Sequence, residues 1–360
     1  AEKFTGLRVK VEKAETQQSY RVYDTPSGAE CFEAGEFVIS NCVERKDPET
    51  GANLSGQFLL PDFDRFEEIG AGASSKVYKA IHGPTQKTFA LKALDITEQA
   101  NRRQLVNELQ ALIDSKHPNI VSLQEAFYSR TQVFMMLEFM DRGSLEKILQ
   151  DGYKFHEDVL ALITAQCLLA LCYLHEQRFC CHRDLKPANI FLTAEGIVKI
   201  GDFGVAAVQS FDRTDRDQTT FVGTAKYMSP ERVTGNSYSF SSDVWSLGIV
   251  VLECHKGTFP WVVTGGFFDF FNQVVDNPVP LPQPGQCSPE FAEFVAFCLD
   301  KDAGTRISAR DAYCHEYIQQ HREKGQSYLQ DWLLRPPEKA KPKPKASAAV
   351  VDSPKSDGAE

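Results

Sequence analysis

The sequence His182-Arg-Asp-Leu-Lys-Pro-Ala-Asn189 carries more chemical information than any other stretch of this chain. It combines one carboxylate, two cations and an amide. A short β-prone run, Ile197-Val-Lys-Ile200, follows it and leads into Asp202-Phe-Gly204. Two carboxylates and an asparagine on neighbouring loops can hold Mg²⁺ and a phosphate-bearing substrate. The octet together with Asp-Phe-Gly is not expected by chance, so the rest of the chain is compared with it.

Composition limits the possible classes of protein. The chain has 360 residues, 42% of them hydrophobic, which is enough for two or three domains or for one two-lobed enzyme with extensions. A net charge of -10 argues against nucleic acid as the main partner. We expect no membrane span, because no apolar run approaches the roughly 18 residues required, and we find no signal-peptide pattern.

The ten cysteines do not form a disulfide framework in a chain of this length. Most lie among apolar residues, where buried reduced thiols are expected, and their spacing does not match a zinc site. These features predict a reduced, cytoplasmic protein, and an additional nuclear location is compatible with them.

The first 62 residues contain only weak strand patterns, at 7–11, 20–23 and 36–39, followed by a polar stretch, 44–56, that is typical of a linker. So few strands could scarcely bury a core alone. We therefore expect this extension either to dock on the main body or to remain loose.

A glycine-rich turn lies between two β-prone runs at 68–78. Gly70 and Gly72 allow the backbone to approach phosphates, although Ser75 occupies the position of a usual third glycine. The strand 88–94 then places Lys92 in an apolar run, where its charge requires a partner. The helical pattern at 104–113 offers Glu108, so the sequence predicts an ion pair between these two side chains.

Periodicity and turn residues predict the remaining elements. A core helix is expected at 158–177, because that stretch is apolar on every side. Ser288 and Pro289 begin another helix as cap and first residue. The other expected elements are strands at 120–123 and 133–140, helices from 241 to about 257 and from 308 to 320, and an amphipathic segment at 328–334 that packs on the body.

With these residues in hand, the chain resembles a eukaryotic protein kinase over residues 63–318. The elements occur in the kinase order: the glycine loop, Lys92, Glu108, His-Arg-Asp184, Asn189, Asp202-Phe-Gly and Ser229-Pro-Glu231. The resemblance implies an α+β, two-lobed kinase fold with a β-rich N-lobe, a helical C-lobe and ATP between them. The implied organisation is an extension at 1–62, an N-lobe at 63–138, a C-lobe at 139–318, an amphipathic segment at 319–335 and a disordered tail at 336–360.

The resemblance also implies residue roles. Asp184 would accept the proton of the substrate hydroxyl, and Lys186 would neutralise charge on the phosphoryl group during its transfer. Asn189 and Asp202 would hold Mg²⁺. Further expectations are a Glu231–Arg306 ion pair, anchoring of the catalytic loop by Asp243, and a hydrophobic column between the lobes formed by Leu112, Leu123, His182 and Phe203. The implied ATP-binding residues are Ile69, Gly70, Ala71, Gly72, Ala73, Ser74, Ser75, Lys76, Val77, Ala90, Lys92, Glu108, Leu137, Glu138, Met140 and Phe191.

Within the kinases, Lys186 two residues after Asp184 fits serine/threonine or dual-specificity members. The runs 138–145, 221–232 and 242–248 resemble MAP kinase kinases of plant or protist type. Thr214 and Thr220 have the five-residue separation of the plant-type activation segment, so both are expected phosphorylation sites. A phosphate on Thr220 would pair with Arg183 and order the segment.

This resemblance implies a MAP kinase as substrate and a MAP kinase kinase kinase as upstream activator, with ATP and Mg²⁺ as cofactors. Two alternatives remain open. The first is a serine/threonine kinase of the NIMA-related group, which shares the Tyr-Met-Ser-Pro-Glu231 run. The second is a kinase fold that serves as a silent scaffold, which the presence of Lys92, Asp184, Asn189 and Asp202 disfavours.

Overall fold

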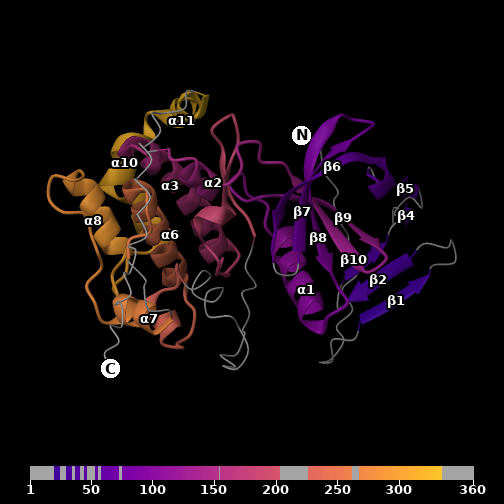
Figure 1. Ribbon diagram of the computed structural model, residues 1–360, viewed down its shortest axis with the longest axis horizontal. Coiled ribbons are helices and arrows are strands. Elements are labelled where there is room, and N and C mark those ends of the chain that lie inside the picture. Colours follow the sequence, from indigo (N-terminus) through magenta and orange to yellow (C-terminus); the bar gives the residue numbers. More distant parts are fainter. Residues whose placement is uncertain are drawn as a thin grey trace, which may run out of the picture.

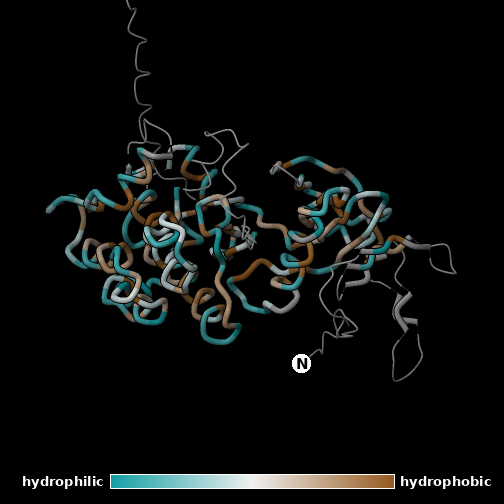
Figure 2. Tube along the Cα trace, turned by 90° about the horizontal axis from the view of Figure 1, so that it is seen from below, coloured by the Kyte–Doolittle hydropathy of each residue, from teal (hydrophilic) through white to brown (hydrophobic). Residues whose placement is uncertain are grey.

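The computed structural model describes residues 20–24, 30–34, 37–40, 44–46, 53–55, 58–72, 75–153, 155–202, 226–261 and 267–334. Two lobes lie side by side, a sheet-rich one and a helical one (Figure 1), which confirms the expected α+β, two-lobed fold. In the perpendicular view (Figure 2), hydrophobic stretches run through both lobes. The residues that form the candidate site come from both lobes.

The N-lobe is built on a five-stranded antiparallel sheet in the order β6-β7-β8-β10-β9. Its strands are rich in β-branched and aromatic residues, and they alternate between two buried faces. One face carries an aromatic cluster that includes Phe63, Phe89 and Phe127. The other packs on helix α1 (Gln99–Asp114). The strands are β6 (Phe63–Ala71), β7 (Ser75–His82), β8 (Lys87–Asp95), β9 (Leu123–Ser129) and β10 (Gln132–Glu138), and a 3-10 turn, Leu60–Asp62, precedes them.

A second, three-stranded sheet precedes the N-lobe in the chain. Its strands are β1 (Tyr20–Asp24), β2 (Glu30–Ala34) and β3 (Phe37–Ser40), and β2 and β3 pack on β9. The Phe32 side chain is completely buried, with its ring 5.8 Å from that of Tyr128. Figure 1 shows this sheet on the side of the N-lobe away from the C-lobe. The hydrophobic core of the N-lobe therefore continues into the N-terminal extension.

The C-lobe is organised around helix α3. Its residues are buried nearly all round, because α6, α9, α10 and α11 pack against it. The elements are α2 (Leu145–Gln150), α3 (Glu157–Cys172), a π-helical turn (Tyr173–Gln177), a 3-10 turn (Pro187–Asn189), β11 (Ile190–Leu192), β12 (Val198–Ile200), α5 (Pro230–Val233), α6 (Phe240–Lys256), α7 (Phe267–Val275), α8 (Pro289–Cys298), α9 (Ala309–Cys314), α10 (Glu316–Arg322) and α11 (Gly325–Leu334).

Local signals account for several helix ends. The Ser288 hydroxyl accepts a hydrogen bond from the Phe291 amide, so the predicted cap of α8 is confirmed. Helix α6 ends at Gly257, which has the left-handed φ of 69° that glycine adopts without strain. The amphipathic end of the chain is α11. It packs on α3, with Leu329 buried and the Trp332 ring 5.2 Å from that of Phe155.

Helix α3 and its π-helical extension correct one expectation. Glu157–Gln177 is long and apolar enough to cross a membrane by length and composition, and 78% of its most apolar window is buried inside the protein. The expectation that no apolar run reaches this length is therefore wrong. The expectation of a core helix is confirmed, because the apolar side chains are covered by the rest of the C-lobe.

Three further elements differ from expectation. Only Leu123 of the run 120–123 joins the N-lobe sheet, as the first residue of β9, whereas Val121 N donates to Ile200 O and ties the start of the run to the C-lobe. The helix expected at 308–320 is two helices, α9 and α10, which break at His315, where ψ is 145°. The expected linker 44–56 contains two paired strands, β4 (Glu44–Lys46) and β5 (Asn53–Ser55).

Candidate active site

Asp184 lies in the loop between the π-helical turn and β11, and its carboxylate is held by two donors. Lys186 Nζ donates to Oδ2 at 2.8 Å, and Asn189 Nδ2 donates to the same oxygen at 3.0 Å and to the Asp184 carbonyl at 2.8 Å. Because both side-chain bonds are made to Oδ2, Oδ1 is the oxygen with capacity to accept a proton. The arrangement suits a general base next to a positive charge.

The loop that carries Asp184 is fixed from below by Asp243, which is fully buried in α6. The Asp243 carboxylate accepts hydrogen bonds from His182 N, Arg183 N and His175 Nε2 at 2.8–2.9 Å, as well as from the Tyr238 hydroxyl. Burial raises the pKa of Asp243, but these donors outweigh it and the pKa is lowered. Asp243 therefore stays ionised, and the predicted anchor is present.

His182 joins this loop to the strand that ends before Asp202. Its Nε2 donates to Gly201 O at 3.1 Å, and Asp184 N lies 3.4 Å from its Nδ1. Complete burial lowers the pKa of the imidazole, which keeps it neutral with the proton on Nε2.

Lys92 connects the two lobes. Its Nζ lies 2.5 Å from Glu108 Oε1 in α1 and 2.7 Å from Asp202 Oδ1, which follows β12. Burial lowers the pKa of the ammonium, but attraction to the two carboxylates outweighs it, so the pKa is raised. The same cation outweighs burial at Asp202 and lowers the pKa of that carboxylate. The predicted Lys92–Glu108 pair is present, and a second acid from the other lobe shares the lysine.

The sequence of this chain is similar to the sequences of known proteins. The protein kinase domain family matches residues 63–318. The chain belongs to the protein kinase family. It is 37% identical over 333 residues to mitogen-activated protein kinase kinase 1c of Physcomitrium patens, covering 88% of this chain and 95% of that protein. It is 38% identical over 316 residues to mitogen-activated protein kinase kinase 1 of Arabidopsis thaliana, covering 84% and 88%.

A third relative, mitogen-activated protein kinase kinase 3 of Arabidopsis thaliana, is 40% identical over 294 residues. That alignment covers 81% of this chain but 56% of the relative, which is therefore considerably longer than the aligned region. These similarities place the chain in the MAP kinase kinase group of the protein kinases. The NIMA-related alternative is set aside on this ground.

Protein kinases generally use ATP and Mg²⁺, and the donor set of this kinase fits the metal. Asn189 donates through Nδ2 to Asp184, which leaves its Oδ1 as a ligand oxygen. Asp202 supplies a carboxylate that is 39% exposed. Mg²⁺ is usually held by one or two carboxylates together with waters and substrate phosphates. Accordingly, no group of three or more His, Cys, Asp or Glu side chains that could hold a metal occurs among the described residues.

The predicted adenine-contacting residues share one face of the N-lobe sheet. In the register, Val77 pairs with Lys92 and Ala90 pairs with Leu137. Paired residues in a sheet point to the same side, and Ala90 and Lys92 lie two residues apart on one strand. The side chains of Val77, Ala90 and Leu137 therefore point the same way as Lys92, toward the cleft. Phe191 approaches from β11 of the C-lobe, where it is partly buried.

The hinge strand is tied to the C-lobe by a contact that the sequence reading missed. Glu138 Oε1 accepts from Lys199 Nζ at 2.8 Å and from Ser122 N at 2.7 Å. Lys199 lies between buried Val198 and Ile200 in β12. This alternation is the signal that could have identified Lys199 as facing away from the core, although it does not name the partner.

The predicted Glu231–Arg306 ion pair is also present. Arg306 Nη1 and Nη2 donate to the two carboxylate oxygens of Glu231 at 2.8 and 2.9 Å. Burial raises the pKa of Glu231, but the bonds from Arg306 outweigh this and lower the pKa to about 2. The pair joins the start of α5 to the segment before α9.

Two groups of predicted site residues lie outside the described part of the chain. Ala73 and Ser74 belong to the glycine-rich turn between β6 and β7, where Gly72 N donates to Ser75 O at 2.7 Å. Thr214 and Thr220 belong to the segment between Asp202 and Lys226, as does Phe203 of the predicted hydrophobic column. Their assignments remain predictions from the sequence.

Proposed function

We propose that this kinase phosphorylates the threonine and tyrosine of a MAP kinase activation loop, using ATP and Mg²⁺. The similarity to MAP kinase kinases over most of the chain supports the choice of substrate. The observation that carries the chemistry is the doubly engaged Lys92, which lies at 2.5 Å from Glu108 and 2.7 Å from Asp202. One cation thereby connects a carboxylate of the N-lobe with a carboxylate of the C-lobe, and this supports the proposed phosphoryl transfer.

In the proposed reaction, Asp184 accepts the proton of the substrate hydroxyl through Oδ1. Lys186, 2.8 Å from the other oxygen of Asp184, neutralises charge on the transferred group. Lys92 holds the non-transferred phosphates, and Asn189 and Asp202 would hold Mg²⁺, which would supply positive charge against the negative charge of the phosphates. The protein supplies mainly position and charge in this reaction.

Activation is proposed to occur by phosphorylation of Thr214 and Thr220 by a MAP kinase kinase kinase. Each phosphate adds a charge of about -1.5 to -2 and three strong acceptors. Arg183 is the proposed partner for the phosphate on Thr220, since its side chain is exposed and it directly precedes Asp184. The thiol-rich composition suits a cytoplasmic location for this step, and a nuclear location is also compatible.

The test combines the purified kinase, an active upstream kinase, ATP-Mg²⁺ and a panel of inactive MAP kinases, with phosphorylated residues mapped by mass spectrometry. We expect phosphate on both threonine and tyrosine of one activation loop. The signal should be lost in Asp184→Asn and strongly reduced in the double variant Thr214→Ala, Thr220→Ala. Phosphorylation of serine peptides alone would exclude a MAP kinase kinase, and nucleotide binding without any transfer would indicate a scaffold.

A further inference from the structure

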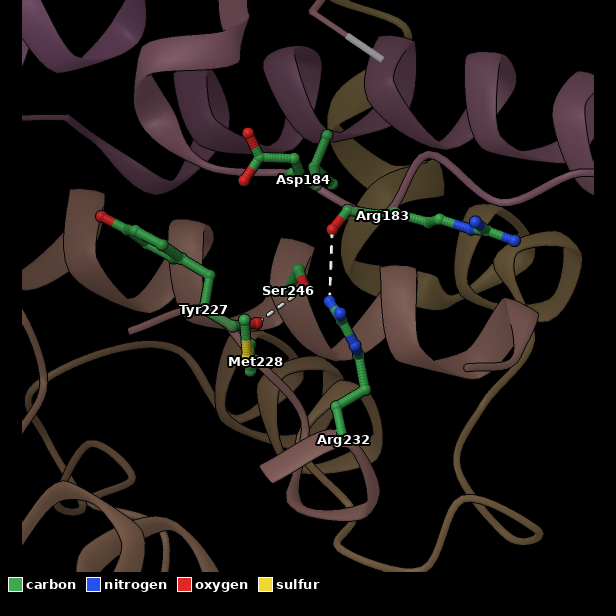
Figure 3. A pocket seen from close by; sticks show the side chains of 7 residues that line it. Arg183, Asp184, Tyr227, Met228, Arg232 and Ser246 are labelled. Atoms are coloured by element: carbon green, nitrogen blue, oxygen red, sulfur yellow. Dashed lines mark hydrogen bonds between the residues drawn. The ribbon is translucent and has the colours of Figure 1, made fainter. Parts of the chain in front are cut away.

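Arg232, at the end of the Ser-Pro-Glu-Arg run, has a place that the proposed chemistry does not explain. It extends from α5 toward the catalytic loop, and its Nη1 lies 3.4 Å from the carbonyl oxygen of Arg183 (Figure 3). The guanidinium of Arg183 points away from this contact. Arg232 therefore approaches the backbone of the residue that directly precedes Asp184.

The same guanidinium stacks on Tyr238. Its Cζ lies 4.6 Å from the centre of the Tyr238 ring, within the range of a cation–π contact. The hydroxyl of Tyr238 donates to Asp243 Oδ1, the oxygen that also accepts from Arg183 N. Arg232 thus contacts the catalytic loop directly through the Arg183 carbonyl and indirectly through Tyr238 and Asp243.

The residue held in this way has a strained backbone. Arg183 has a φ of 70°, in the left-handed region that non-glycine residues rarely adopt. Such a conformation persists only where the surroundings fix it. The amide of Arg183 is fixed by Asp243, and its carbonyl by Arg232. Both the amide and the carbonyl of Arg183 therefore have a partner, and the next residue in the chain is the candidate base, Asp184.

We propose that Arg232 is a positioning residue that sets the orientation of Asp184. It acts through the carbonyl of Arg183 and, by holding Tyr238 in place, through Asp243. This contact also joins the catalytic loop to α5, beside the small pocket that Asp184, Tyr227 and Met228 line. This inference rests on phosphoryl transfer by Asp184 and is independent of which protein is the substrate.

The competing explanation is that Arg232 contacts the substrate, since it also lines this pocket. The slow transfer of phosphate from ATP to water separates the two roles. Asp184 also activates the attacking water in this reaction, and the reaction does not involve a side chain that only binds a protein substrate. Loss of a positioning residue lowers both reactions, whereas loss of a substrate contact lowers only phosphorylation of the protein.

The experiment compares Arg232→Met, Arg232→Lys and Tyr238→Phe with the unmodified kinase. Methionine removes the charge and the donors, whereas lysine keeps the cation over the ring and one donor group. Phenylalanine keeps the ring and loses only the bond to Asp243. The matched control is Arg322→Met, which removes another arginine stacked on a tyrosine, 5.4 Å from the Tyr313 ring at the far end of the C-lobe.

We expect Arg232→Met to lower kcat for ATP hydrolysis and for protein phosphorylation together, by about tenfold to hundredfold. The dissociation constant for ATP should change by less than about twofold, because nucleotide is bound by other residues. Arg232→Lys should recover part of the loss, and Tyr238→Phe should show a smaller loss in the same direction. Arg322→Met should leave both rates unchanged.

Combining Arg232→Met with Tyr238→Phe should cost less than the sum of the two single changes, because both act on the connection through Tyr238 and Asp243. Unchanged ATP hydrolysis with a raised KM for the protein substrate would overturn the proposal in favour of a substrate contact. A lower melting temperature with unchanged kcat in both reactions would overturn it in favour of a purely structural role.

Discussion

Replacing Glu231 by glutamine tests how strongly the Glu231–Arg306 pair holds the C-lobe together. The Arg306 side chain is fully buried and that of Glu231 is 12% exposed. Arg306 also donates to Ser241 O at 3.0 Å and to Asp300 O at 2.7 Å, and its guanidinium lies 5.1 Å from the Trp245 ring. Glutamine keeps the size and one acceptor oxygen but leaves the buried guanidinium without a counter-charge.

The lowered pKa of Glu231 gives the size of the expected loss of stability. A drop from 4.5 to about 2 corresponds to about 3 kcal/mol of stabilisation of the native state by the ionised carboxylate. Measured losses on breaking one partner of a buried pair are of the same order, about 3–5 kcal/mol. For a domain of this size, the expected decrease in melting temperature is about 6–12 °C.

The pH dependence has a definite sign. The folded pKa of Glu231 lies below the unfolded value, so its contribution is fully present above pH 4.5 and is lost as pH falls toward 2. The difference in unfolding free energy between the native protein and Glu231→Gln should therefore be constant from about pH 8 to pH 5. Urea unfolding, followed by tryptophan fluorescence, measures it at several pH values.

The control is Glu176→Gln, which removes the acid of the Glu176–Arg310 pair, whose side chains are 42% and 55% exposed. Exposed pairs contribute little because water screens them, so this variant should unfold almost like the native protein. Two results would refute the reasoning. One is a loss below about 1 kcal/mol for Glu231→Gln, and the other is a difference that changes markedly between pH 8 and pH 6.

Two further variants test other parts of the structure. Lys92→Met leaves Glu108 buried without its partner and should lower kcat by roughly 10²–10³-fold, measured in steady-state assays alongside nucleotide binding. Retention of native kcat would show that this cation does not act in the reaction. Gly248→Ala places a Cβ 2.8 Å from that of Cys298 and 2.9 Å from Leu299 Cδ2, so urea unfolding should show a loss of about 1–3 kcal/mol from overpacking between α6 and α8. Native stability would mean that these two helices separate easily.

Much of the fold is predictable from local pattern in this chain. The apolar run 88–94 places Lys92 in a buried strand, and the spacing of 104–113 places Glu108 on the inner face of a helix. Ser288-Pro289 and Gly257 mark helix ends by their own conformational preferences. These signals depend on neighbouring residues in the chain, so they can be recognised without knowledge of the tertiary structure.

The errors occur where a distant partner decides the local structure. The run 120–123 has a strand pattern, yet Ile120 and Val121 pair with β12, far along the chain. The contacts of Lys199 and Arg232 were missed for the same reason, since neither partner is near in sequence. One error has a local cause instead: the break at His315 is stabilised by a cap that histidine does not usually signal, in which its Nδ1 accepts from Tyr317 N at 3.2 Å.

The two strained residues of the site explain why its parts cannot be changed independently. Arg183 and Asp202 both have left-handed backbones, with φ of 70° and 51°, and such residues cost about 1–3 kcal/mol each. Asp202 is held by Lys92, and Gly201 before it packs so closely on Val121 that a Cβ would lie 2.8 Å away. Gly201 O also accepts a hydrogen bond from Nε2 of His182, which directly precedes Arg183.

One neutral imidazole thus joins the two strained turns. A shift of the catalytic loop would stretch the bond from His182 to Gly201, the residue before Asp202. The orientation of the candidate base is therefore linked to the backbone next to Asp202, the proposed metal ligand. This link gives a physical reason for expecting the contact of Arg232 with the catalytic loop to affect the rate of transfer.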